Sequence, residues 1–141
     1  MWTYRQRTGE VLRDGRYIAT GYSGHDDGYG IPEPGERKND PSKQEERGIG
    51  PLPVGRYKIG QPFTHPTAGV LAMRLVPLAG TNTFGRSGFL IHGDSIKMPG
   101  SASRGCVVLS RPIRRLIAQS VLDGDDTLTV ESGEAVRAAV A

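Results

Sequence analysis

Apolar residues occur in short runs along most of the chain, and glycine and proline separate these runs. Alternating or continuous apolar runs, which are typical of strands, cover residues 2–4, 11–12, 16–18, 56–59, 70–76, 89–92, 106–109 and 127–130. The turn pairs Thr8-Gly9 and Asp14-Gly15 divide the first three runs and predict an opening meander. The pattern therefore predicts a mainly β fold.

One segment has helical spacing instead. Its apolar positions are Ile113, Leu116, Ile117 and Val121, and the positions opposite are Arg114, Arg115 and Gln119. Ser110 is a suitable N-cap, Pro112 suits a first turn, and Gly124 suits a helix end. We therefore predict a helix over residues 112–122 that covers the sheet with its apolar stripe.

Residues 23–50 are rich in glycine, proline and charge, and they show no apolar periodicity. A segment of this length inside a compact domain is typically a lid, a binding loop or an insert without fixed structure. Residues 131–141 follow the last predicted strand and are expected to form a loosely held tail. The chain is therefore interpreted as one domain, residues 1–130, followed by this tail.

Composition limits the function classes. With 141 residues, of which 36% are hydrophobic, the chain has material for one ordinary core. The net charge is +3, the basic residues are spread among 15 acidic ones, and aromatic residues make up 6% of the chain. Nucleic-acid binders concentrate basic and aromatic residues on one face, so this balance argues against a nucleic-acid partner.

The chain shows neither a signal peptide nor a membrane span in its pattern. Its first residues are polar and are followed by no apolar stretch, and no segment has the roughly 20 apolar residues that a span needs. We therefore expect a protein that is made in the cytoplasm and reaches any outside target by another route.

Two residues beside glycine carry the candidate chemistry. His92 ends the apolar run of residues 89–92, Cys106 begins that of residues 106–109, and the two lie 14 residues apart. A thiol becomes a good nucleophile when a base takes its proton, and a neighbouring imidazole can do this. Adjacent strands would bring the two together, so we predict Cys106 as nucleophile and His92 as its base.

Glycine and serine before the cysteine suit this role. Because Gly105 has no side chain, the amides of Gly105 and Cys106 are expected to approach a developing oxyanion, each contributing about 3–4 kcal/mol. Ser103 is expected to orient the loop or to contact substrate.

Two other interpretations of these residues remain open. A free cysteine is often a small core residue, and Cys106 could be one. His92, Asp94 and Cys106 could instead bind zinc, but the close-spaced ligand pairs of most zinc sites are missing from the sequence. We therefore predict no metal and no other cofactor.

The order of these motifs resembles that of the cysteine-dependent L,D-transpeptidases with the YkuD-type fold. In that family a His-Gly pair precedes Ser-x-Gly-Cys, and this chain has His92-Gly93 followed by Ser103-Arg104-Gly105-Cys106. More closely still, the chain is similar to the small L,D-transpeptidase-related effectors delivered by type VI secretion. The segments that carry this likeness are residues 2–4, 8–9, 21–24, 50–59 and 84–94.

The resemblance implies a β-sandwich or barrel with one or two short helices. It also implies attack by Cys106 on the bond between the diamino acid and the terminal D-alanine of a peptidoglycan tetrapeptide stem. Water would then give L,D-carboxypeptidase activity, and an amine such as a free D-amino acid would give exchange. His92 would act first as base and then as acid, and Ser103, Gly105 and Gly93 fall on the family's motif.

An effector of this kind implies particular partners. These are peptidoglycan stem peptides, a secretion apparatus and an immunity protein, and the place of action would be the periplasm of a target bacterium.

The chain departs from the family around its cysteine. Arg104 stands where most members have a second histidine, and Val108 stands where they have an arginine. We expect Arg104, Arg86 or Arg111 to replace that arginine. The other residues expected to face the substrate are Gly93, Asp94, Tyr22 and Ser23, and Asp94 is also expected to cap a turn or to position His92.

Two further functions compete with this one. A catalytically inactive module that binds cell wall would keep the fold without the reaction. A papain-like amidase would also use a cysteine, but there the cysteine ordinarily precedes the histidine, whereas here His92 comes first.

Overall fold

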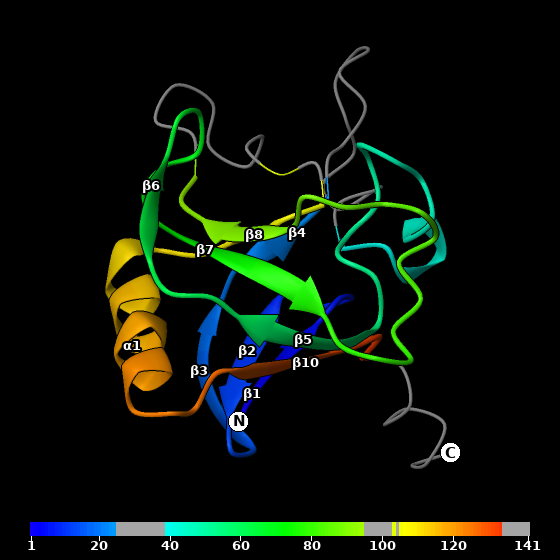
Figure 1. Ribbon diagram of the computed structural model, residues 1–141. Coiled ribbons are helices and arrows are strands. Elements are labelled where there is room, and N and C mark those ends of the chain that lie inside the picture. Colours follow the sequence, from blue (N-terminus) through cyan, green and yellow to red (C-terminus); the bar gives the residue numbers. More distant parts are fainter. Residues whose placement is uncertain (25–38, 95–102, 104, 134–141) are drawn as a thin grey trace.

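The computed structural model describes residues 1–24, 39–94, 103 and 105–133. These residues form a mainly β structure in which one sheet curls into a nearly closed barrel, with helix α1 (Arg111–Leu122) along its side (Figure 1). The prediction of a mainly β fold is therefore confirmed. Within the described part of the chain, no helix has the length and hydropathy needed to span a membrane.

The sheet contains ten strands in the order β3-β2-β1-β10-β5-β7-β8-β9-β4, and β6 pairs with β7 beside this path. The strands are β1 (Trp2–Arg5), β2 (Glu10–Arg13), β3 (Arg16–Thr20), β4 (Tyr22–Ser23), β5 (Gly55–Ile59), β6 (Phe63–His65), β7 (Gly69–Pro77), β8 (Leu90–His92), β9 (Val107–Val108) and β10 (Thr127–Glu131). Two neighbouring pairs are parallel, β1 with β10 and β8 with β9. The predicted opening meander corresponds to β1, β2 and β3.

The barrel closes where β3 passes into β4, because these two strands end the sheet order yet follow each other in the chain. Gly21 lies between them, and a Cβ atom there would stand 2.1 Å from the carbonyl oxygen of Val108. The Gly21 N–H donates to the carbonyl of Gly9 at 2.8 Å, and Gly9 has φ of 75°. Only glycine tolerates this close approach, so the closure depends on these two residues.

The core consists mainly of alternating strand residues, joined by residues of helix α1 and of the segment before β5. Its largest fully buried members are Trp2, Tyr4, Tyr57, Leu52, Ile59, Met73, Ile91 and Ile117. Each buried aliphatic side chain of this size contributes about 1.5–3 kcal/mol. Ile91 of β8 and Val107 of β9 both point into this core, which fixes the faces of the two strands that carry the candidate site.

Helix α1 begins one residue earlier than predicted and is rotated from the predicted face. Ser110 is the N-cap, with extended backbone but no side-chain capping bond, and Gly124 follows the end with φ of 91°. Arg114 is buried, although we predicted it opposite the apolar stripe, and Leu116 is exposed. The Arg114 guanidinium donates to three backbone carbonyl groups, which satisfies its buried donors.

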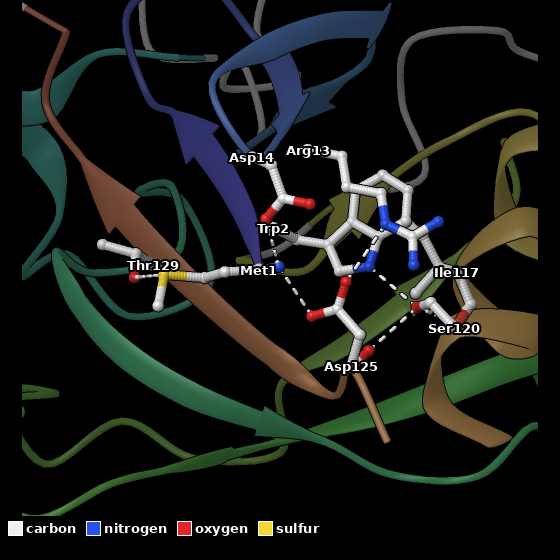
Figure 2. A network of polar contacts seen from close by, with 8 residues as sticks. All are labelled: Met1, Trp2, Arg13, Asp14, Ile117, Ser120, Asp125 and Thr129. Atoms are coloured by element: carbon white, nitrogen blue, oxygen red, sulfur yellow. Dashed lines mark hydrogen bonds and ion pairs between the residues drawn. The ribbon is translucent and has the colours of Figure 1, made fainter. Parts of the chain in front are cut away.

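A polar network joins the first hairpin to the end of α1 (Figure 2). The indole Nε1 of Trp2 donates to Ser120 Oγ at 2.8 Å, and that hydroxyl lies 2.7 Å and 2.9 Å from the carbonyl oxygens of Ile117 and Asp125. Arg13 Nε donates to the Asp125 carboxylate at 3.1 Å and its guanidinium lies 5.1 Å from the centre of the Trp2 ring. The network anchors the helix against β1 and β2.

Several predicted boundaries need correction. The apolar segment that ends at residue 92 pairs only from Leu90, and the strand after Cys106 is Val107–Val108. Strands β4 and β6 and the 3₁₀ helix Pro41–Lys43 were not predicted, so residues 23–50 are not one continuous loop. Residues 25–38 and 134–141 lie outside the described residues. Glu131 belongs to β10 and not to the tail, because it pairs with Arg5 in the ladder and accepts its Nε–H at 2.9 Å.

Candidate active site

His92 and Cys106 lie on neighbouring parallel strands. The register of β8 and β9 places His92 opposite Val108, and Cys106 directly precedes β9. Since successive side chains alternate between faces, Cys106 and His92 share the face of this pair that is opposite to the core residues Ile91 and Val107. The two predicted reactive residues are therefore brought to one surface of the sheet.

The imidazole of His92 is held in a defined tautomer. Its side chain is 6% exposed, and Nδ1 lies 2.7 Å from the carbonyl oxygen of Gly93. A carbonyl only accepts, so Nδ1 carries the hydrogen and Nε2 keeps its lone pair. Burial lowers the pKa of His92, and the nearby Arg114 and His65 lower it further, against the opposing effect of the Gly93 carbonyl. The ring is therefore a neutral base at pH 7.

The thiol of Cys106 is half-buried and neutral at rest. Burial raises its pKa, whereas a backbone hydrogen bond from Leu90 and the charge of Arg86 act to lower it. The Sγ atom lies 3.9 Å from the carbonyl oxygen of Gly88. Both groups are therefore neutral in the resting protein, and a thiolate would require transfer of the thiol proton to a base.

No hydrogen bond joins Cys106 to His92 within the described residues. Their positions are diagonal across the parallel strand pair, because the register places His92 opposite Val108, two residues beyond Cys106. Catalytic hydrogen bonds often tighten only when substrate is bound, and one water molecule can also carry the proton. The arrangement brings the two side chains to one surface of the sheet without a hydrogen bond between them in the described residues.

The hydroxyl of Ser103 holds the loop that carries the cysteine. The residue is fully buried, and its Oγ donates to the carbonyl of Cys106 at 2.6 Å. It also accepts the N–H of Gly24 at 2.9 Å and the N–H of Gly105 at 3.2 Å. Of the two predicted roles of Ser103, this geometry matches the positioning of the loop.

The amide groups around the cysteine differ in what they can bind. The N–H of Gly105 is directed at Ser103, whereas the N–H of Cys106 has no hydrogen-bond acceptor in the described part of the chain. The Cys106 amide is therefore the one that can receive an oxyanion.

Arg86 lies directly against the cysteine loop. Its guanidinium donates to the carbonyl oxygens of Pro51 and Gly50, each at 2.9 Å, and to that of Gln44. A Cβ atom on Gly105 would stand 2.2 Å from Arg86 Nη2, and Gly105 has φ of 122°, so glycine is required there. The side chain that we predicted to bind substrate is thus buried beneath the loop, where its charge favours the thiolate.

The other predicted substrate contacts divide into two groups. Tyr22 and Asp94 lie at the surface near His92, and the Tyr22 hydroxyl donates to Asp94 Oδ1 at 2.6 Å. Ser23 is fully buried, and its Oγ accepts the N–H of Leu52 at 2.8 Å. Arg104 lies outside the described residues. The structure therefore places Tyr22 and Asp94, but not the Ser23 side chain, where a ligand could reach them.

A family comparison covers most of this structure. The model of the Tlde1 domain matches residues 18–132. The chain belongs to the Tlde1 domain family. This is a family of type VI secretion effectors, so the predicted effector class is confirmed, and with it secretion toward target cells. No curated protein and no solved structure matches the chain.

The match of the Tlde1 domain includes every residue of the candidate site. It begins within β3 and ends just after β10, so it also contains the closure of the barrel and helix α1. Strands β1 and β2 lie outside the match, yet Trp2, Tyr4 and Val11 belong to the core. The first seventeen residues therefore complete the barrel on which this Tlde1 domain builds its site.

Sequence reasoning missed Arg114 as a residue of the Tlde1 site. It is 7% exposed, donates from Nε to the Leu109 carbonyl at 3.0 Å, and reaches the carbonyl of Val70 at 2.9 Å. A Cβ atom on Gly93 would stand 2.6 Å from its Nη2. Arg114 thus packs under the turn after His92, a position that the helical pattern alone could not reveal.

Two hollows lie near the predicted pair, His92 and Cys106, of this Tlde1 domain. A cavity of about 430 Å³ is lined by Arg47, Gly48, Gly85, Arg86, Ser87 and Phe89. A second of about 310 Å³ is lined by Thr20, Gly21, Tyr22, Asp94, Val108, Leu109, Ser110, Arg111 and Arg114. The first adjoins the cysteine loop through Gly88, and the second adjoins His92 through Val108 and Asp94.

A zinc site from the predicted ligands is not assembled in the described residues. No group of three or more histidine, cysteine, aspartate or glutamate side chains gathers there as a metal site. His92 and Asp94 face different partners, the Gly93 carbonyl and the Tyr22 hydroxyl.

Proposed function

We propose that this Tlde1 domain is a cysteine acyl-transfer enzyme acting on peptidoglycan in the periplasm of a target bacterium. It cleaves the bond between the diamino acid and the terminal D-alanine of tetrapeptide stems. One arrangement supports this function above all: Cys106 and a neutral His92 with a free Nε2 share one face of the β8–β9 pair. An immunity protein that blocks this face would protect the producing cells.

In the first half of the reaction the thiol attacks. His92 Nε2 takes the proton from Cys106 while Sγ forms a bond with the carbonyl carbon of the diamino acid. The oxyanion is stabilised by the Cys106 amide and by the nearby charge of Arg86. The C–N bond then breaks, His92 returns the proton to the leaving amine, and D-alanine departs from a thioester.

In the second half the thioester is resolved. Water gives up a proton to His92 and attacks the carbonyl carbon, the C–S bond breaks, and the thiolate regains the proton. A free D-amino acid in place of water would re-form a peptide bond. Hydrolysis and exchange therefore use the same residues and differ only in the acceptor that enters the site.

The test follows D-alanine release from purified tetrapeptide stems by mass spectrometry. Wild-type protein should release D-alanine, and Cys106→Ala should lower the rate by about 10³-fold or more, because the nucleophile is lost. Adding isotope-labelled D-alanine separates exchange from hydrolysis. A folded wild-type protein that releases nothing, yet binds the stems as tightly as Cys106→Ala does, would instead identify a binding module.

A further inference from the structure

The larger cavity beside the cysteine loop has a positive lining. Of the six described residues around its 430 Å³, the two charged ones are Arg47 and Arg86, and Ser87 adds a hydroxyl group. No carboxylate belongs to this described lining. A cavity with two guanidinium groups and a hydroxyl suits an anionic group of small size.

This cavity adjoins the reacting sulfur through one short segment of chain. Ser87 and Phe89 line it, and the carbonyl of Gly88 between them lies 3.9 Å from Cys106 Sγ. Arg86 forms part of its wall and also lies against Gly105. A group bound in the cavity is therefore close to the carbonyl that the thiol attacks.

Of the two arginines that line the cavity, Arg47 is the one with unused hydrogen-bond donors in the described part of the chain. Its side chain is exposed, and Nη2 donates weakly to the Gly85 carbonyl at 3.3 Å. No carboxylate lies within ion-pair distance of it in the described part of the chain, whereas Arg5 has two and Arg13 has one. An arginine fork has five donors and binds a carboxylate with two of them, so Arg47 can receive one.

We propose that this cavity binds a carboxylate of the substrate peptide through Arg47, next to the bond that is cleaved. The inference rests on the proposed function for the identity of the peptide. Two carboxylates of a stem lie near that bond: the terminal carboxylate of D-alanine, three bonds from the attacked carbon, and the side-chain carboxylate of a dicarboxylic diamino acid. Binding of either carboxylate in the cavity would place the reacting carbonyl beside Cys106.

The experiment measures binding, so that it does not depend on turnover. Titration calorimetry with the Cys106→Ala protein would compare three synthetic tetrapeptides: the free acid, its C-terminal amide, and a form amidated at the diamino acid side chain. The same series is repeated with Arg47→Ala and Arg47→Lys added, and with Arg56→Ala as an exposed arginine control. Circular dichroism checks that each variant is folded.

The expected result is that one amidation weakens binding by about 10-fold or more, and that Arg47→Ala weakens binding of the free acid by a similar factor. With Arg47→Ala in place, that amidation should have no further effect. The amidation that matters identifies which carboxylate is bound. Arg47→Lys should keep part of the preference, and Arg56→Ala should keep all of it.

Equal affinity for all three peptides, unchanged by Arg47→Ala, would overturn the subsite. Failure of the proposed function has a different signature. In that case the wild-type protein releases no D-alanine, while the Arg47-dependent preference for a free carboxylate persists.

Discussion

Two arginines near opposite ends of helix α1 differ in the groups that accept their hydrogen bonds. Arg13 donates to the carboxylate of Asp125, just beyond the end of the helix, at 3.1 Å. Arg114, in its first turn, donates to backbone carbonyls, and no carboxylate of the described residues lies within ion-pair distance of it. A carboxylate cancels the charge of a guanidinium, whereas neutral carbonyls satisfy its donors and leave its net charge in place.

The different partners of the two arginines indicate different roles. Arg13 and Asp125 belong to a network that holds β1 and β2 against the helix (Figure 2). Arg114 also holds backbone together, but its remaining charge acts on His92 and adds to the effect of burial in lowering the pKa of that imidazole. One end of the helix thus contributes to stability, and the other also affects the protonation of His92, the base of the proposed reaction.

The largest effect is expected from removing the base itself. His92→Asn keeps a polar group near the Gly93 carbonyl but cannot take the thiol proton, so kcat/KM for D-alanine release should fall about 10²–10⁴-fold. The melting temperature should change little. His65→Asn is the matched control, because His65 lies near His92 and the proposed reaction gives it no role, so activity at pH 8 should persist. Similar losses in both variants would contradict the assignment of His92.

A substitution near the C-terminal end of α1 should change the stability of the protein and not its activity. Ser120→Ala removes the acceptor of the buried Trp2 Nε1 and the donor to the Ile117 and Asp125 carbonyls, so the free energy of unfolding should fall by about 1–3 kcal/mol. Chemical denaturation measures this change. The rate of D-alanine release at 25 °C should stay that of the wild type, and a large loss of rate would contradict a purely structural role for Ser120.

The smallest effect is a displacement of the pH profile. Activity needs a neutral imidazole, and the charge of Arg114 disfavours protonation of His92, so Arg114→Met should raise the pKa of His92. The acidic limb of kcat/KM should therefore move to higher pH. Arg115→Met, an exposed neighbour on the same helix, should leave the limb in place. Circular dichroism must show that Arg114→Met is folded, and an unmoved limb would assign the low pKa to burial alone.

The course of the strands could be predicted well because it follows local patterns. Alternating apolar residues located β1, β5, β7 and β10 to within a residue or two at most boundaries, and turn pairs located the first hairpins. Strands β4 and β6 are short, and their residues are only partly apolar, so they form through pairing with β9 and β7 and not through their own sequence. Such pairing cannot be read from one segment.

The candidate site was predictable in the residues of its sequence motifs, His92, Ser103 and Cys106. The positions of His92 and Cys106 at strand ends followed from the sequence, and the structure brings them to one face. The burial of Arg86 and Arg114 did not, because both are placed by distant carbonyls, as at Gly50 and Val70. A helical wheel put Arg114 on the solvent side, since it counts hydropathy and ignores bonds to the rest of the chain.

The closure of the barrel between β3 and β4 has a further consequence. Tyr22 and Ser23 pair with the strand that follows Cys106, and the next residue, Gly24, is tied to Ser103. Any event that opens the barrel at Gly21 would therefore also release one side of the loop that carries Cys106. Under the proposed function, the rate of D-alanine release would then report whether the barrel is closed, and a protein that binds over this closure would inhibit release without contacting the sulfur.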